Sequence, residues 1–240
     1  MKVGIIGLGK MGEAIAYRLM QAEHEVIGYD QSKQTMHEAE KIYVKTVASV
    51  AEVAAQARII WLMVPAGPAV DTVIKELIPH LKAGDVVIDG GNSNYKDSIR
   101  RAEALKTQGM FFIDCGTSGG LAGRAQGFSL MVGGDNAIYT KIHPLLVAIA
   151  APGGVGHVGP SGAGHYVKMV HNGIEYALLQ AYAEGFQLLH EGSYKDAPLD
   201  LAAITRIWNK GSVIRSWILE LSHDIFAKDQ LLKSISGEVQ

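Results

Sequence analysis

Residues 2–12 read KVGIIGLGKMG, and this stretch decides the fold. An apolar run rich in Val and Ile ends at three glycines, Gly7, Gly9 and Gly12, which stand at the spacing GxGxxG. An amphipathic helical pattern, MGEAIAYRLMQA, follows at once. A buried strand, a glycine turn and a helix in this order are typical of the first unit of a parallel α/β sheet.

A second apolar run, HEVIGYD, ends in an acid, Asp30, 18 residues after Gly12. Together with the glycine turn, this acid completes the fingerprint of a dinucleotide site. Gly7 permits the tight turn, Gly9 lets backbone approach a pyrophosphate, and Gly12 lets the helix pack on the strand. The N-terminus of the helix supplies N–H groups and a partial positive charge to the pyrophosphate. A glycine turn without a ligand is the alternative interpretation.

Asp30 would accept hydrogen bonds from the ribose hydroxyls of the adenosine half, and its charge would repel a 2′-phosphate. The sequence therefore predicts NAD as the preferred cofactor, with NADP as an alternative because Lys33 lies nearby. Asp30 could instead be a solvated residue at the end of a strand. The predicted cofactor site comprises Gly7, Leu8, Gly9, Lys10, Met11, Gly12 and Asp30.

Strand-like and helix-like patterns continue to alternate up to Gly120. The apolar runs are KVGIIG, HEVIGYD, RIIWLMVP, DVVIDGG and FFIDCG. Strict alternation predicts a parallel sheet covered by helices on both faces. After Gly120, SLMVGGD and GGVGHVG predict further strands at the sheet edge, and NAIYTKIHPLLVAIA predicts a helix between them.

The glycine-rich segment PSGAG, residues 160–164, marks a domain boundary. Beyond it every pattern is helical: a long helix from about Gly164 to Leu189, one over LDLAAITRIW, and one over SVIRSWILELSHDIFA with Ser212 as N-cap. The sequence thus predicts a Rossmann-type, doubly wound, mostly parallel sheet in residues 1–162 and an all-α domain in residues 163–240.

Composition excludes several classes of protein. The chain has 240 residues, 48% of them hydrophobic, and a net charge of −2, which is no nucleic-acid footprint. No run approaches the ~18 apolar residues of a membrane span, and the N-terminus resembles a strand rather than a signal peptide. The single cysteine, Cys115, cannot form an internal disulfide, which favours a reducing, cytoplasmic setting.

The segment KMVHNGIEY, residues 168–176, carries reactive groups at helical spacing. Lys168, His171, Asn172 and Glu175 would share an arc of roughly 100° on a helix. The opposite side, predicted to be the packing face, holds Met169, Val170, Ile174, Ala177 and Ala181. Burial disfavours the ammonium form, so Lys168 could accept a proton from a substrate alcohol, and Glu175 could later donate one. A solvated polar face is the alternative.

Several motifs together resemble the decarboxylating 6-phosphogluconate dehydrogenases. They are GLGKMG, VIDGGNSNY, DCGTSGG, SLMVGGD and GAGHYVKMVHNGIEY, in this order and spacing. YDQS and GTSGG most resemble the short, NAD-preferring branch, and the resemblance extends from Met1 to about Ala227. The related β-hydroxyacid dehydrogenases share the fold and the lysine, but resemble a KxxNN pattern and lack HNGIEY.

The resemblance implies oxidation of 6-phosphogluconate at C3 by hydride transfer to NAD or NADP, then loss of carbon dioxide and protonation to ribulose 5-phosphate, a step of the pentose phosphate pathway. Lys168 matches the general base and Glu175 the general acid, and no metal is needed if protonated Lys168 stabilises the enolate oxygen. The implied substrate residues are Asn92, Ser118, Gly119, Gly120, His171 and Asn172, with Tyr176 at the phosphate. Val64, Pro65 and Ala66, with Asn92, would line the cofactor.

Each implied contact also has a structural interpretation. Asn92 could shape a turn, Ser118 to Gly120 could be a flexible connection, and His171 and Tyr176 could be ordinary packing residues. At the level of the whole chain, a related β-hydroxyacid dehydrogenase and a non-catalytic dinucleotide-binding fragment are the alternative functions.

The sequence departs from the family at its C-terminal end. Family members continue beyond SISGEVQ with basic groups that hold the substrate phosphate, whereas Arg206, Lys210 and Arg215 stand outside those motifs. The expectation is a truncated piece of a longer enzyme, or a short homologue that is impaired or acts on an unphosphorylated acid. The resemblance also implies a homodimer through the helical domain, whose apolar residues Trp208, Trp217, Ile218, Leu219 and Leu221 would need cover.

Overall fold

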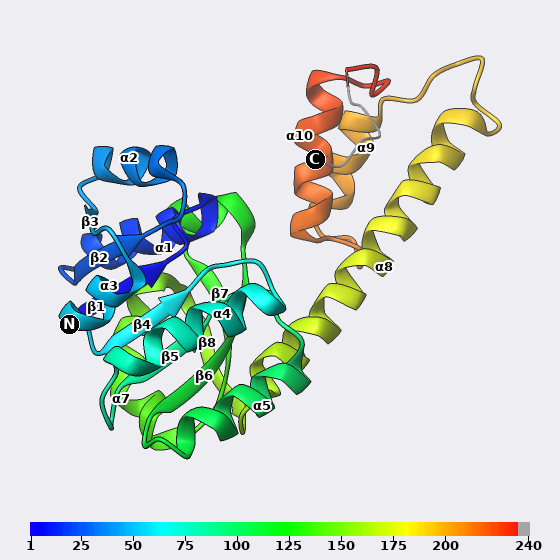
Figure 1. The fold of residues 1–240 in the computed structure, drawn as a ribbon. Coiled ribbons are helices and arrows are strands. Elements are labelled where there is room, and N and C mark those ends of the chain that lie inside the picture. The colour runs from blue at the N-terminus through cyan, green and yellow to red at the C-terminus, as the bar shows by residue number, and fades with distance from the viewer. Residues whose placement is uncertain (235–240) are drawn as a thin grey trace. The chain divides into compact units, whose positions relative to one another are not determined.

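The computed structural model describes residues 1–234, and the chain divides into two compact units, the first Met1–His171 and the second beginning at Asn172. In the first unit eight strands form one sheet in the order β3-β2-β1-β4-β5-β6-β7-β8 (Figure 1). The strands are β1 (Lys2–Ile6), β2 (Glu25–Tyr29), β3 (Lys45–Thr46), β4 (Ile59–Leu62), β5 (Val86–Asp89), β6 (Phe111–Ser118), β7 (Phe128–Gly133) and β8 (Ala150–Gly159).

Helices join the strands of the first unit and continue into the second. They are α1 (Lys10–Gln21), α2 (Lys33–Lys41), α3 (Val50–Gln56), α4 (Pro68–Leu77), α5 (Tyr95–Lys106), α6 (Gly123–Gln126), α7 (Asn136–Ile149), α8 (Ala163–Glu191), α9 (Leu201–Trp208) and α10 (Trp217–Lys228). Short 3₁₀ turns are η1 (Ile78–His80) and η2 (Gly120–Ala122). Within residues 1–234, no helix is both long and apolar enough to cross a membrane.

Alternating side chains of each central strand enter two different cores. In β4, Ile59 and Trp61 pack with residues of α1 and α7, whereas Ile60 and Leu62 pack with residues of α3 and α4. All four side chains are buried, and burying each contributes about 1.5–3 kcal/mol. Because both faces are buried, the strands are uninterrupted apolar runs. The predicted parallel sheet, covered by helices on both faces, is confirmed.

The direction in which strands are added to the sheet reverses at β1. β1 pairs in parallel with β2 on one side and with β4 on the other. The chain therefore adds β2 and β3 on one side of β1 and then crosses back to add β4 on the other side. In such sheets ligands bind at the carboxyl ends of the strands, at this switch point. The glycine turn after β1 and the loop after β4 therefore lie at the expected ligand edge.

The edge of the sheet departs in detail from the expectation. The strands predicted after Gly120 are present, and β7 runs antiparallel to β6 while β8 runs parallel to β7. The two-residue strand β3 was missed, because so short a segment has no readable alternation. The predicted N-cap of the last helix is wrong: Ser216, not Ser212, accepts the N–H of Leu219, and α10 begins at Trp217.

The second unit has its own small core. Phe186, Leu201, Leu219 and Phe226 are buried together, and the Phe186 and Phe226 rings meet edge to face at 4.9 Å. Leu219, expected to need cover from a partner, is therefore fully buried by its own chain. On the same helix, Trp217 and Leu221 remain 45% exposed.

Candidate functional site

The glycine turn has the shape that a bound pyrophosphate requires. Gly7 has a φ of +93°, and a Cβ there would lie 2.3 Å from the Met63 carbonyl oxygen. A Cβ on Gly12 would lie 1.9 Å from the Gly7 oxygen, so only glycine lets α1 approach the turn. Gly9 faces open space, with no atom within 4 Å of a Cβ, and caps α1 without a side chain. The residues therefore fit a dinucleotide, which would lie against the backbone of Gly9.

Asp30 is tied to this turn. One carboxylate oxygen accepts the N–H of Leu8 and the other accepts the N–H of Ser32, both at 2.8 Å. These bonds fix a half-buried carboxylate beside the glycine turn, where a ribose would lie. Lys33 is exposed at the start of α2, whereas Lys10 and Met11 form the start of α1.

Two loops meet at the ends of β4 and β5. Val64, Pro65 and Ala66 follow β4, and Asn92 follows β5, its parallel neighbour. A Cβ on Gly91 would lie 3.2 Å from the Val64 carbonyl oxygen, so the two backbones touch. The structure therefore brings together the two loops that carry Val64 to Ala66 and Asn92, which the sequence predicts to line the cofactor.

Helix α8 lies directly against the sheet where Lys168 occurs. A Cβ on Gly116 in β6 would lie 2.5 Å from the Lys168 Cβ. A Cβ on Gly164 would lie 2.4 Å from the backbone carbonyl oxygen of Asp114. Glycines at both contacts let the helix backbone approach the strands. As a result Lys168 is only 8% exposed, which is rare for a lysine on a helix.

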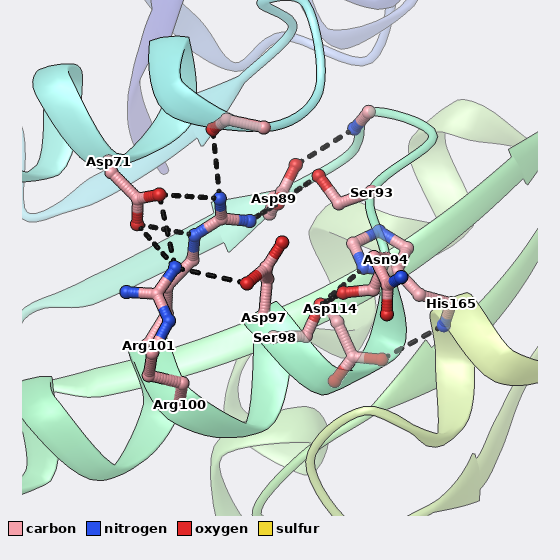
Figure 2. Close-up of polar contacts among 12 residues, drawn as sticks. Asp71, Asp89, Ser93, Asn94, Asp97, Ser98, Arg100, Arg101, Asp114 and His165 are labelled. Atoms are coloured by element: carbon pink, nitrogen blue, oxygen red, sulfur yellow. Dashed lines mark hydrogen bonds and ion pairs between the residues drawn. The ribbon is translucent and has the colours of Figure 1, made fainter.

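A buried carboxylate holds the start of this helix. Asp114 is fully buried in β6, and its two oxygens accept the N–H groups of Gly162, at 2.7 Å, and His165, at 3.0 Å. Figure 2 shows the bond to His165. The His165 ring lies 2.7 Å, Nδ1 to Oγ, from Ser98 of α5. Its Nε2 is buried and has no hydrogen-bond partner among residues 1–234. Asp114 thereby caps the start of α8, which lies five residues before Lys168 in the chain.

Lys168, His171 and Ser118 form a chain of polar contacts. Lys168 Nζ lies 3.4 Å from His171 Nδ1, and His171 Nε2 lies 3.3 Å from Ser118 Oγ. When Nζ donates to Nδ1, the imidazole carries its proton on Nε2 and donates to the hydroxyl, so one neutral tautomer serves both contacts. Gly119 and Gly120 follow with φ values of +131° and +50°, which turn the chain beside Ser118.

The remaining implied residues continue along α8 into the second unit. Asn172 and Glu175 are half-buried, whereas Tyr176 is 65% exposed. Among residues 1–234, no three His, Cys, Asp or Glu side chains are grouped closely enough to hold a metal ion.

The predicted packing face of α8 is wrong for this chain. Met169 and Val170 are 50% and 45% exposed and Ile174 is 59% exposed, while Lys168 on the polar side is buried. The physical reason is that the close contacts of Gly116 and Gly164 bring the polar side of the helix against the sheet. Helical periodicity separates two faces but does not say which one the sheet covers.

The buried charged residues that sequence reasoning missed include Asp89, Arg101 and Asp114. Asp89 could have been recognised, since an Asp before Gly-Gly-Asn-Ser is a signal for a side chain that bonds the following turn. An acid inside the apolar run FFIDCG was a similar signal for Asp114. Arg101 had no local signal, because an arginine on a helix is usually exposed.

Family models match nearly the whole chain. The model for the NAD binding domain of 6-phosphogluconate dehydrogenase matches residues 2–168, and that for the C-terminal domain matches residues 164–236. A relative from Haloferax volcanii, named an NAD(+)-dependent, decarboxylating 6-phosphogluconate dehydrogenase, is 50% identical over 95% of this chain and 76% of its own length.

Solved structures of two kinds of dehydrogenase resemble this chain. Plasmodium falciparum 6-phosphogluconate dehydrogenase is 31% identical with a TM-score of 0.85, over 97% of this chain and 52% of that one. Mycobacterium tuberculosis 3-hydroxyisobutyrate dehydrogenase is 25% identical with a TM-score of 0.79, over 92% of this chain and 74% of that one. With its dinucleotide turn and buried helical lysine, the chain belongs to the 6-phosphogluconate dehydrogenase family.

Proposed function

We propose that this chain oxidises and decarboxylates 6-phosphogluconate to ribulose 5-phosphate and carbon dioxide with reduction of NAD. The observation that carries the proposal is the burial of Lys168, at 8% exposure, beside the sheet that holds the dinucleotide turn. The names of the relatives from Haloferax volcanii and Plasmodium falciparum support the same reaction.

Lys168 acts as the general base in this proposal. When bound, NAD supplies the acceptor for the hydride from C3 of the sugar acid. Lys168 Nζ takes the proton of the C3 hydroxyl, and the resulting ammonium then stabilises the oxygen that becomes an enolate as carbon dioxide leaves. His171, 3.4 Å from Nζ and bonded to Ser118, orients the lysine and contacts a substrate hydroxyl.

Glu175 is the proposed general acid, seven residues after Lys168 in α8. It gives a proton to the carbon that has lost carbon dioxide. Asn92, Ser118, Gly119, Gly120, His171 and Asn172 are the proposed contacts to the sugar acid, and Tyr176 the proposed contact to its phosphate.

NAD is the preferred cofactor because of Asp30. Its carboxylate is fixed by the N–H groups of Leu8 and Ser32, so it cannot turn away from a 2′-phosphate without breaking both bonds. Asp30→Ala should narrow the ratio of catalytic efficiency between NAD and NADP. Equal efficiency of the unaltered protein with both cofactors would refute the preference.

The test of the activity is absorbance of the reduced nicotinamide. The protein is mixed with 6-phosphogluconate, and with NAD or NADP in separate cuvettes, beside Lys168→Ala. A rise with NAD that Lys168→Ala lacks is expected. An equal rise in absorbance in both proteins would show that Lys168 is not the general base. No rise in absorbance, with NAD still bound, would mean that the chain is a non-catalytic dinucleotide-binding fragment.

A related β-hydroxyacid dehydrogenase is the second candidate, favoured by the similarity to the mycobacterial 3-hydroxyisobutyrate dehydrogenase. The segment HNGIEY argues against it. A screen of small 3-hydroxy acids distinguishes the two, because turnover of these and not of 6-phosphogluconate would select the second candidate.

Residues 1–162 are the proposed dinucleotide-binding domain. Residues 163–240 are the proposed substrate and dimerisation domain, and the last six of them lie outside the described residues.

The proposed homodimer would cover Trp217 and Leu221, each 45% exposed, and an apolar groove of about 400 Å³ in the second unit between α8 and α10. The proposed location is the cytoplasm, in keeping with the single, buried Cys115. A monomer mass independent of protein concentration, measured by sedimentation, would refute the dimer.

A further inference from the structure

The loop residues of the proposed site are held by charges buried beneath them. Asp89, at the end of β5, accepts the N–H of Gly91 at 3.1 Å and the hydroxyl of Ser93 at 2.8 Å. These two donors flank Asn92 in the chain. Asp89 therefore forms hydrogen bonds to the turn on both sides of Asn92. The side chain of Asp89 is only 1% exposed.

Arg101 of α5 joins this turn to the loop after β4. Its Nη1 lies 3.4 Å from Asp89, and its Nη2 donates to the carbonyl of Gly67 at 3.0 Å. Gly67 directly follows Val64, Pro65 and Ala66 and has a φ of +90°. One guanidinium thus contacts both loops through Asp89 and Gly67. Figure 2 shows its bond to Asp89 and its pair with Asp71.

Asp71 completes the arrangement from α4. It accepts from Arg101 Nε at 3.0 Å and from Nη2 at 3.1 Å, a bidentate pair that fixes the plane of the guanidinium. The Arg101 side chain is 1% exposed, so the guanidinium is shielded from the bulk water that could replace these partners. A lysine could not reach Asp71, Asp89 and Gly67 together, because it lacks the planar fork.

We propose that Arg101 is a positioning residue that holds the Val64–Ala66 loop and the Asn92 turn at a fixed separation. Because the first loop lines the cofactor and the turn contacts the sugar acid, Arg101 would set the distance across which hydride passes. The inference rests on the proposed function for its catalytic part, whereas the effect on the two loops is independent of it. Misplacement of about 1 Å between reacting atoms costs up to about 100-fold in rate.

The neighbouring arginine is a matched control. Arg100 pairs with the same Asp71, at 3.0 Å, and with Asp97, at 3.2 Å, but its side chain is 56% exposed. Its hydrogen bonds, drawn in Figure 2, go to Asp71 and Asp97, which belong to helices α4 and α5 rather than to the two loops. Arg100→Lys therefore alters the pairing of Asp71 while the charge stays the same, and it leaves the bonds to Asp89 and Gly67 in place.

The first measurement is amide hydrogen exchange on the protein without ligand. Arg101→Lys should speed exchange by about 10-fold or more in the peptides that cover residues 64–67 and 90–93, and Arg100→Lys should not. Ser93→Ala, a milder change that removes one bond to Asp89, should affect only the 90–93 peptide. Unchanged exchange of both peptides in Arg101→Lys, or equal acceleration in every peptide, would overturn the proposal.

The second measurement separates binding from turnover. Arg101→Lys should lower kcat with 6-phosphogluconate by about 10-fold or more, a larger factor than the increase in the Kd for NAD measured by calorimetry. A kcat equal to that of Arg100→Lys would overturn the catalytic part. If the unaltered protein shows no turnover, the proposed function has failed, and the exchange pattern alone still decides whether Arg101 holds the two loops.

Discussion

Gly12 shows how a single residue decides whether the dinucleotide turn can form. A Cβ there would lie 1.9 Å from the backbone oxygen of Gly7, which cannot move without opening the turn. We expect Gly12→Ala to cost about 1–3 kcal/mol of unfolding free energy and to weaken NAD binding by about 10-fold or more.

Urea denaturation and calorimetric titration with NAD check this expectation. Gly185→Ala is the control, because Gly185 lies in helix α8 with no atom within 4 Å of a Cβ and alanine favours helix by about 1 kcal/mol. If Gly12→Ala binds NAD as the control does, the close approach of α1 to the turn is not needed.

Asp71 links residue chemistry to the pH dependence of stability. Its hydrogen bond to Arg101, with help from Arg100, holds its pKa below the ordinary value of 3.8. A carboxylate with a lowered pKa in the folded state contributes stability above its unfolded pKa, and loses that contribution as pH falls through the folded pKa. We therefore expect Asp71→Asn to be less stable at neutral pH and to lose less stability on acidification.

Urea midpoints at pH values from about 7 down to about 3 test this expectation. The difference between the unaltered protein and Asp71→Asn should be full at neutral pH and should shrink below the unfolded pKa. A constant difference across that window would show that Asp71 is not held by its arginine partners.

At the scale of elements, the position of α8 depends on its cap. The two oxygens of Asp114 each accept one backbone N–H, from Gly162 and from His165. Asp114→Asn replaces one acceptor oxygen with a donor that faces an N–H group. We expect a loss of about 1–3 kcal/mol of stability, and a lower kcat because Lys168 is carried on the same helix.

Asp135→Asn provides the comparison for this prediction. Asp135 caps α7 and accepts the N–H groups of Ala137 and Ile138 with one and the same oxygen, so an asparagine can replace it. Urea denaturation and turnover should show the Asp135 variant close to the unaltered protein. Equal stability of the two variants would mean that the second oxygen of Asp114 does not hold α8.

For the whole molecule, Cys115 reports on unfolding. It is fully buried in β6, and burial raises the pKa of its thiol to about 12. The thiol is therefore protonated and inaccessible at neutral pH in the folded protein, and reactive only when the sheet opens. We expect iodoacetamide to label Cys115 slowly in buffer and completely in urea, as followed by mass spectrometry.

The concentration of urea at which labelling of Cys115 begins should match the unfolding transition of the first unit. Rapid labelling in buffer would show that β6 is exposed by local opening rather than by global unfolding. Because Cys115 is the single cysteine of the chain, the added mass identifies its site without further mapping.

The sequence by itself determined the alternation of strands and helices, apart from the two-residue strand β3, and the dinucleotide turn. Alternation, glycine spacing and apolar runs are local patterns, and Gly7, Gly9 and Gly12 are needed for reasons that depend on adjacent backbone. The polar arc that contains Lys168 and His171 was also readable, since helical periodicity repeats within a few residues.

The tertiary structure alone decided which face of α8 is buried and how the buried charges pair. Asp114 meets the start of α8 across 48 residues of chain, and Arg101 meets the Gly67 carbonyl across 34. Such pairs depend on strand order and on the close packing that glycines permit, which no local pattern records. The cost of burying a charge without a partner then makes these distant contacts obligatory.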